Sequence, residues 1–204
     1  RDVLKMGLGA GAALLLDGMP ALAQQQQRAL ITKPIPSSGE RIPVIGLGSS
    51  GTFNLAPGNP EYSSGQDVIK LFKELGGKVI DTSPTYQRSE TFIGETVRQF
   101  NIQNDLFLAT KVNVGDAGIA AARAQMDESS RVFGKRVIDL MQVWNLGDSI
   151  RNLTDNFLDA HMEAVTAWKA EGRCRYIGIT TSRDPQYADV EAAMRKFRVD
   201  FVQL

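Results

Sequence analysis

Residues 78–111, KVIDTSPTYQRSETFIGETVRQFNIQNDLFLATK, decide the fold of this chain. The run 78–81 predicts a strand, and apolar residues at helical spacing (Ile93, Val97, Phe100) predict a helix from Ser89 to Phe100. A second apolar run, 106–111, predicts the next strand. A strand, a helix and a strand in this order indicate two parallel strands joined by a crossover helix.

The same alternation continues on both sides of this unit. We expect further strands at 44–48, 138–143, 176–179 and 201–204, and further helices at 67–75, 119–132, 156–171 and 185–197. In the helix 67–75 we expect a core face made of Val68, Leu71, Phe72 and Leu75. Two extended pieces within 31–43 predict a hairpin-like turn. Unbroken apolar strands between helices are typical of a parallel sheet covered by helices, either open and doubly wound or closed as an eight-stranded barrel.

One motif favours the open sheet at first sight. Gly46, Gly48 and Gly51 fit the spacing of a dinucleotide-binding loop directly after a strand. Such a loop must open a helix whose N-terminus holds the pyrophosphate, and the segment 52–60 has two prolines and no helical period. The barrel is therefore the preferred interpretation.

Composition excludes several classes of function. The 204 residues (22.3 kDa) are enough for one domain, or one domain with a tail, and Lys+Arg and Asp+Glu are 23 each. Because basic residues are not in excess, the composition gives no indication of a nucleic-acid partner. The single cysteine, Cys174, excludes an internal disulfide, and the single histidine, His161, excludes a histidine-cluster metal site.

The first 23 residues have the layout of an export signal. A charged start, Arg1–Lys5, precedes a weakly apolar stretch, 6–16, and a small-residue cleavage site ends at Ala23. The stretch is too short to span a bilayer stably. The start resembles a twin-arginine signal without its first arginine. We expect a signal (1–23), a linker (24–36) and part of a barrel (37–204), with recognition by export machinery, a periplasmic location and a buried Cys174. A short amphipathic N-terminal helix is the alternative.

In a parallel barrel, functional residues lie where the strands end. Those positions here carry Gly48, Ser49, Asp81 with Tyr86, Lys111, Trp144, Thr180, Thr181 and Gln203. A carboxylate, a phenol and an ammonium at one end indicate proton chemistry. We expect Lys111 to lower the pKa of Tyr86, and Asp81 to keep Lys111 charged, so that Tyr86 can donate a proton to a developing alkoxide. Taken singly, Asp81 also fits a turn cap, Tyr86 a surface ring and Lys111 a solvated strand end.

Five motifs in order carry a resemblance to a known family. They are DTSPTY (81–86), SETFIG (89–94), ATK (109–111), IDLMQV (138–143) and EGRCRYIG (171–178). From about Pro36 to Leu204 the chain resembles the aldo-keto reductases. The resemblance implies a (β/α)8 TIM-type barrel that reduces aldehydes and ketones with NADPH and without a metal. Because the chain ends in the sixth of eight expected strands, we expect a fragment of a longer gene product.

The resemblance also implies a role for each strand-end residue. Tyr86 would be the general acid, Lys111 its partner, and Asp81 the partner of Lys111. The nicotinamide would be bound by Asp81 and by residues of later strands, Thr180, Thr181 and Gln203. Gly48 and Ser49 would lie in the first-strand loop near the cofactor.

One position departs from the family. Five residues after Asp139 the family has a catalytic histidine, and this chain has Trp144. An indole N–H can hold the substrate carbonyl, and the ring can fill the pocket or stack on a ligand. We expect His161, on a helix face, not to replace the histidine. Two functions follow: reduction of a small carbonyl compound with NADP(H), or a catalytically impaired cofactor-binding relative used for sensing or interaction.

Overall fold

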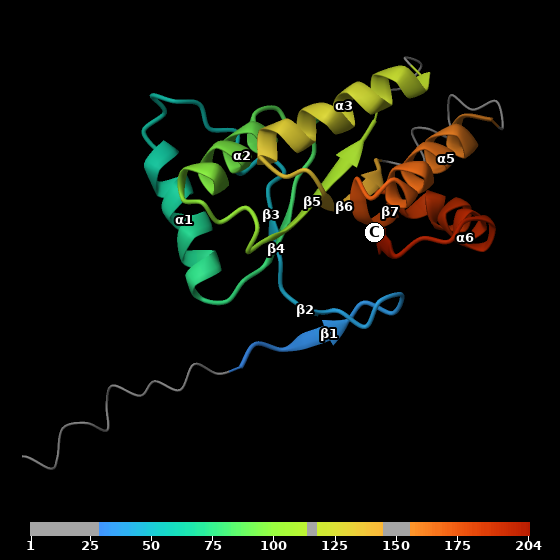
Figure 1. Ribbon diagram of the computed structural model, residues 1–204, viewed down its shortest axis with the longest axis horizontal. Helices are drawn as coiled ribbons and strands as arrows, with labels where there is room; N and C mark the ends of the chain where they lie inside the picture. The colour runs from blue at the N-terminus through green and yellow to red at the C-terminus, as the bar shows by residue number, and fades with distance from the viewer. Residues whose placement is uncertain (1–28, 114–117, 145–155) are drawn as a thin grey trace, which may run out of the picture. The chain divides into compact units, whose positions relative to one another are not determined.

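The computed structural model describes residues 29–113, 118–144 and 156–204, and residue contacts divide the chain into units 1–30 and 31–204. The predicted signal, 1–23, lies outside the described residues. In the second unit, six parallel strands follow one another in chain order across a single curled sheet (Figure 1). They are β3 (Leu47–Gly48), β4 (Val79–Asp81), β5 (Phe107–Val112), β6 (Ile138–Val143), β7 (Cys174–Thr180) and β8 (Phe201–Gln203). The predicted order of strands is confirmed.

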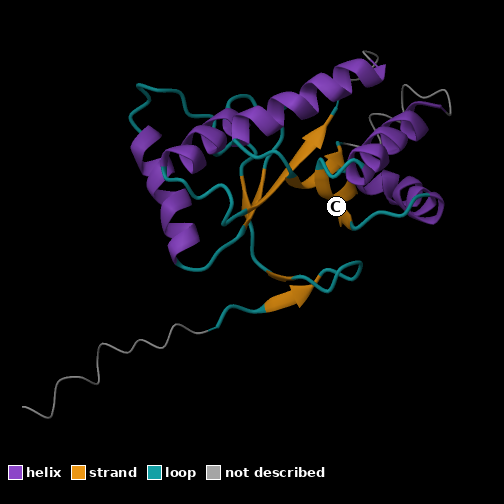
Figure 2. Ribbon diagram, viewed as in Figure 1, coloured by secondary structure: helices purple, strands orange, loops and turns teal. Residues whose placement is uncertain are grey.

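Helices connect these strands and cover one face of the sheet (Figure 2). They are α1 (Tyr62–Glu74), α2 (Ser89–Gln99), α3 (Gly118–Phe133), α5 (Asn156–Ala170) and α6 (Tyr187–Lys196), the last preceded by the 3-10 turn η2 (Asp184–Gln186). A strand order that never reverses along the sheet is the order of a barrel rather than of a doubly wound sheet. The fold class predicted from the sequence is therefore confirmed, with six strands of the barrel among the described residues.

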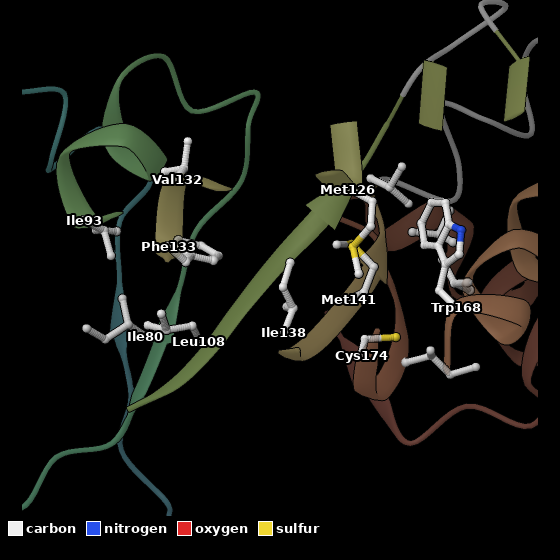
Figure 3. Close-up of a cluster of buried hydrophobic side chains, with 14 of the residues drawn as sticks. Ile80, Ile93, Leu108, Met126, Val132, Phe133, Ile138, Met141, Trp168 and Cys174 are labelled. Carbon is white, nitrogen blue, oxygen red and sulfur yellow. The ribbon is translucent and has the colours of Figure 1, made fainter. Parts of the chain in front are cut away.

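The main core lies between the sheet and the helices (Figure 3). Strand residues such as Ile80, Leu108 and Met141 meet helix residues such as Phe133 and Trp168, and all five are fully buried. Cys174 joins this core, and its predicted burial is confirmed. Burial raises the pKa of the Cys174 thiol to about 12, so the thiol is unreactive at neutral pH.

The core face predicted for the first helix is wrong at three of its four residues. Phe72 is half-buried and packs against the core, whereas Val68, Leu71 and Leu75 are exposed, and α1 buries Gly65, Gln66 and Ile69. The physical reason is a close approach at Gly65: a Cβ atom there would lie 2.6 Å from Leu55 Cδ1 and 2.9 Å from Phe92 Cζ. The helix turns its smallest residue toward α2 and the loop before α1, and this rotates the longer apolar stripe outward.

A second apolar cluster fills the other, concave face of the sheet. It is made of alternate strand residues such as Phe107, Leu140 and Tyr176, with Phe201 packed against it. The rings of Phe107 and Tyr176 are stacked with centroids 5.8 Å apart. These residues occupy the N-terminal part of each strand, so the concave face of the sheet is apolar at that end. Toward the C-terminal end of the strands the same face becomes polar.

The predicted hairpin is confirmed and covers this apolar end. It pairs β1 (Thr32–Pro34) with β2 (Arg41–Pro43) in antiparallel register. Ile35 of its turn is buried in the second cluster. The Tyr176 hydroxyl donates to Glu40 at 2.6 Å, which ties the hairpin to β7. Within the described residues, no helix is long and apolar enough to cross a bilayer.

Candidate active site

The C-terminal ends of the strands carry the polar side chains of the concave face. Register places Gly48 beside Asp81, Lys111 beside Gln142, and Thr180 beside Gln203. Because side chains alternate along a strand, the residues two positions after the apolar layer point to the same side of the sheet. The sequence-predicted residues of β4, β5, β7 and β8 are thereby brought to one end of one face.

Asp81 and Lys111 form a buried ion pair. The Lys111 Nζ atom donates to Asp81 Oδ1 at 2.8 Å and to Oδ2 at 2.7 Å, and also to the Thr82 carbonyl at 3.0 Å. Only 2% of the Lys111 side chain is exposed. Burial lowers the pKa of Lys111 below its usual range, and the Asp81 carboxylate opposes this effect. The pair that the strand-end positions suggested, and that the resemblance implied, is present, so neither residue is a solvated strand end or a simple cap.

Tyr86 lies in the turn that follows β4, over the same lysine. The Lys111 Nζ atom is 5.1 Å from the centre of the Tyr86 ring. The next residue, Gln87, has a left-handed backbone (φ 53°), which costs energy in a residue with a side chain. The Asn54 side chain holds this turn, because it hydrogen bonds to Gln87 and accepts the Arg88 backbone N–H at 3.3 Å. The loop after β3 thus fixes the position of Tyr86.

The expected lowering of the Tyr86 pKa is wrong. Burial raises the pKa of Tyr86 above its usual range, and the nearby Asp81 carboxylate raises it further. The Lys111 charge that was expected to favour the phenolate is already compensated by Asp81, and it lies over the ring face. A high pKa keeps Tyr86 protonated at neutral pH, which is the form that a proton donor requires.

Trp144 reaches this tyrosine directly. Its backbone N–H donates to the Val112 carbonyl at 3.0 Å, which places Trp144 immediately after β6. A hydrogen bond from the indole to the Tyr86 hydroxyl lowers the pKa of Tyr86. The indole N–H is only a donor, so it donates to the phenol oxygen and leaves the phenol O–H for another acceptor. Of the residues predicted as catalytic, the structure brings together Asp81, Tyr86, Lys111 and Trp144.

Two glutamine amides complete the surroundings of Asp81. Gln142 Nε2 donates to Asp81 Oδ1 at 3.2 Å, and Gln203 Nε2 donates to Asp81 Oδ2 at 3.2 Å. Gln203 is expected from the resemblance to bind a cofactor amide, and its own amide lies against the Asp81 carboxylate. Sequence reasoning missed Gln142. The available signal was a polar residue inside the apolar strand 138–143, at the position that alternates with Leu140 on the concave face.

The residues predicted to bind a cofactor lie at the same strand ends. Gly48 is exposed, and a Cβ atom there would meet nothing within 4 Å. The Ser49 hydroxyl is buried without a partner in the described part of the chain, and the Ser49 carbonyl accepts the Ser89 hydroxyl at 3.0 Å. Thr181 bonds to Gln203 through its backbone N–H at 3.0 Å.

This group fits a nicotinamide carboxamide by its chemistry. Thr180, Thr181 and Gln203 are neutral hydroxyl and amide side chains, which can both donate to and accept from an amide. At Gly48, which is in register with Asp81, a Cβ atom would meet open space. Among the described residues, no group of three or more His, Cys, Asp or Glu side chains is placed to bind a metal ion.

Two further buried polar residues lie behind the sheet. Glu90 of α2 accepts hydroxyl hydrogen bonds from Thr110 and Ser129, and burial raises its pKa from 4.5 to about 7. Sequence reasoning missed this group. His161 is buried in α5 beside Met162, in the layer between helices and sheet, so it does not occupy the site formed by the strand ends.

A cavity of about 520 Å³ lies elsewhere, at the opposite ends of β6 and β7. Among its lining residues are Lys135 and Arg173, which precede these strands. Both are paired with carboxylates, Lys135 with Asp139 and Arg173 with Asp127. The cavity therefore shares no residue with the Asp81 cluster.

Comparison with known proteins identifies the family of this chain. Residues 44–204 match the model of the aldo/keto reductase family, and the chain belongs to this family. It is 27% identical over 169 residues to norsolorinic acid reductase B of Aspergillus parasiticus, covering 72% of this chain and 42% of that protein. It is 24% identical over 165 residues to an aryl-alcohol dehydrogenase of Pestalotiopsis microspora, covering 71% and 41%. The chain thus spans about two fifths of the length of these curated relatives.

Solved structures show the same fold. An aldo-keto reductase from Bacillus halodurans superposes with a TM-score of 0.68 at 22% identity, over 85% of this chain and 56% of that chain. An aldo-keto reductase from Klebsiella pneumoniae in complex with NADPH superposes with a TM-score of 0.64 at 22% identity, over 81% and 54%. At this level of identity the likeness establishes the fold.

Proposed function

We propose that this protein reduces an aldehyde or ketone with NADPH, and that Tyr86 donates the proton. The observation that carries the proposal is the cluster at the strand ends, in which a protonated phenol lies over a buried ammonium paired with Asp81. Family membership supports oxidoreductase chemistry, and a family relative of the same fold is solved with NADPH.

The chain's own residues divide the work in this proposal. Tyr86 donates its phenolic proton to the alkoxide that develops on the substrate. The Trp144 indole N–H stabilises the phenolate that remains, and Asp81 holds Lys111 beneath the Tyr86 ring. Trp144 also presents an aromatic surface at the site, which favours a substrate with an apolar part.

Thr180, Thr181 and Gln203 would hold the nicotinamide carboxamide, with Gly48 leaving space for the cofactor. The bound cofactor supplies the hydride, and the protein supplies position and the proton. The preference for NADPH is proposed from the family and from the solved relative.

Tyr86→Phe in the full-length protein tests the proposal. We expect NADPH oxidation on a panel of aldehydes to fall by a factor of about 10²–10⁴, because a general acid contributes this much. Cofactor binding, measured by nicotinamide fluorescence, should not change. The matched control is Tyr187→Phe, which removes an exposed phenol of α6 bonded to Asp184. Equal turnover by the two variants would refute the role of Tyr86.

A cofactor-binding relative without turnover is the second candidate. It is favoured by Trp144, whose hydrogen bond is made to Tyr86, and by the raised pKa of Tyr86, which weakens its acidity. A wild-type protein that changes nicotinamide fluorescence but oxidises no NADPH with any carbonyl compound would support this candidate over the first.

We also propose that residues 1–23 direct export to the periplasm. The support is the sequence layout alone, a charged start, an apolar stretch and a small-residue cleavage site. Fusion of the full-length protein's N-terminal segment to a reporter that is active only after export tests it. A reporter that stays inactive, while the same reporter with a known twin-arginine signal is active, contradicts the proposal.

A further inference from the structure

Gln142 is a buried amide in the middle of the proposed site. It lies on β6, in register with Lys111 on one side and Gly178 on the other, and only 2% of it is exposed. A buried amide without a hydrogen bond destabilises the folded state, so its partner is significant. That partner is Asp81 Oδ1, at 3.2 Å from Gln142 Nε2.

The neighbouring strand leaves room for this side chain. A Cβ atom on Gly178 would lie 3.1 Å from Gln142 Cγ, closer than ordinary contacts between such atoms. The side chain of Gln142 therefore begins beside the one residue of β7 that has no side chain. From there its amide extends away from β7, past β5, to a carboxylate on β4.

The Asp81 carboxylate is held symmetrically. Each of its oxygens accepts one bond from Lys111 and one from a glutamine amide, Gln142 on Oδ1 and Gln203 on Oδ2. The two amides differ in exposure. Gln203 is exposed on the last described strand, whereas Gln142 is enclosed by the sheet. The exposed Gln203 amide can exchange its bond to Asp81 for one to a ligand. The buried Gln142 amide has no access to solvent and keeps its bond to Asp81.

We propose that Gln142 is a positioning residue, whose amide fixes the orientation in which the Asp81 carboxylate holds Lys111 beneath Tyr86. The effect of Gln142 on turnover rests on the proposed reductase function, whereas its effect on the orientation of Asp81 is independent of that function. A donor is needed at this position because a carboxylate held from only one side can rotate away from the lysine. Displacement of about 1 Å in such a cluster is enough to reduce the rate by a factor of about 100.

Gln142→Met in the full-length protein is the first test, because methionine is similar in size and has no N–H donor. We expect kcat to fall about 10- to 100-fold with KM unchanged. The alkaline limb of the pH–rate profile should move to lower pH, because Lys111 loses part of the carboxylate interaction that raises its pKa. The control is Gln66→Met, which removes a buried amide of α1 bonded to Gln99 at 2.8 Å, far from Asp81 in the chain's fold.

Gln142→Glu tests the donor itself. A protonated glutamic acid can donate to Asp81, whereas an ionised one repels it, because two carboxylates that share a site hold one proton between them. We expect this variant to approach wild-type turnover at acidic pH and to lose it as the pH rises. A purely structural role for Gln142 does not produce this rescue.

A double-mutant cycle on unfolding separates this inference from the reductase function. If Gln142 acts through Asp81, then Gln142→Met lowers the urea unfolding midpoint in wild type and has a much smaller effect in Asp81→Asn. Equal shifts in both backgrounds overturn the proposal, as does a Gln142→Met variant with the kcat and pH profile of Gln66→Met. If wild type shows no turnover, the reductase function fails, and the cycle still decides whether Gln142 positions Asp81.

Discussion

The Lys111 ammonium lies 2.7 Å from the Asp81 carboxylate, with 2% of the lysine side chain and 21% of the aspartate side chain exposed. Water therefore solvates the carboxylate partly and the ammonium hardly at all. The buried Lys111 charge is tolerated because the ammonium donates hydrogen bonds to both oxygens of the Asp81 carboxylate and to the Thr82 carbonyl. Removing only one partner of such an ion pair leaves the other charge buried without compensation, which lowers the free energy of unfolding.

Asp81→Asn should therefore destabilise the fold as well as the site. The substitution leaves Lys111 buried without its counter-charge, and loss of one partner of a buried pair costs about 3 kcal/mol or more. Urea unfolding of Asp159→Asn is the comparison, because Asp159 pairs with Lys196 at the exposed surface and such pairs contribute about 1 kcal/mol or less. Similar losses in the two variants would show that Lys111 does not depend on Asp81.

Trp144→Phe should raise the pKa of Tyr86. The indole hydrogen bond is the interaction that lowers this pKa, while burial and Asp81 raise it, and phenylalanine keeps an aromatic ring without the donor. Titration of tyrosinate absorbance, with Tyr86→Phe as the reference, measures the shift. An unchanged titration would show that the indole does not reach the hydroxyl.

Trp144→His tests what the departure from the family means for catalysis. If the tryptophan limits turnover, an imidazole that can donate to the substrate carbonyl should raise aldehyde reduction, because one well-placed donor is worth a factor of about 10²–10³. The measurement is kcat/KM on the aldehyde that wild type reduces best. A decrease would show that Trp144 is part of the working site.

Glu90 makes stability depend on pH. Its pKa rises from 4.5 in the unfolded chain to about 7 in the folded chain, so between these values the folded state binds more protons than the unfolded state. Stability therefore falls as the pH rises through this window, by about 3 kcal/mol for a shift of this size. Glu90→Gln should remove the fall and be more stable than wild type above about pH 7. Urea unfolding from about pH 5 to about pH 8 measures both. Glu74→Gln, at an exposed residue of α1, should keep the wild-type slope.

The strand order could be predicted because its signals are local. Each strand of the barrel is an apolar run between turn residues, and the site residues Asp81 and Lys111 end two of these runs. Parallel strands in chain order bring their C-terminal ends together, so position placed Asp81 and Lys111 at one end of the sheet, and the resemblance to the aldo-keto reductases implied their pairing.

What could not be predicted depends on distances between segments. The direction of the Tyr86 pKa shift is set by burial and by how far Asp81 compensates Lys111, and neither is encoded by spacing. Gln142 was missed because a polar residue in a mostly apolar strand has no local signature of its partner, which is 61 residues away in the chain. The hydrogen bond from the Arg88 backbone N–H to Asn54 could not be predicted for the same reason, because it joins two loops that meet only after folding.

Gly94 makes a second long-range requirement testable. A Cβ atom there would lie 2.3 Å from the Val132 carbonyl oxygen, where α2 meets α3, and a backbone atom cannot move aside as a side chain end can. Gly94→Ala should destabilise by about 1–3 kcal/mol or more despite the better helix propensity of alanine. Gly48→Ala, where a Cβ atom meets nothing within 4 Å, should leave the unfolding midpoint nearly unchanged. Equal midpoints for the two variants would place α2 and α3 farther apart than the structure does.

The face of α1 could not be chosen from periodicity, because apolar residues occur on two overlapping stripes. Ile69 lies on one and Leu71 on the other, and the contact at Gly65 with Leu55 and Phe92 selects the first. Ile69→Ala should therefore lower the free energy of unfolding by about 2–5 kcal/mol, the cost of emptying a filled core position. Leu71→Ala, at a residue that is 53% exposed, should change it by about 0.5 kcal/mol or less. Chemical denaturation measures both changes, and a loss at Leu71 as large as that at Ile69 would show that α1 buries the other stripe as well.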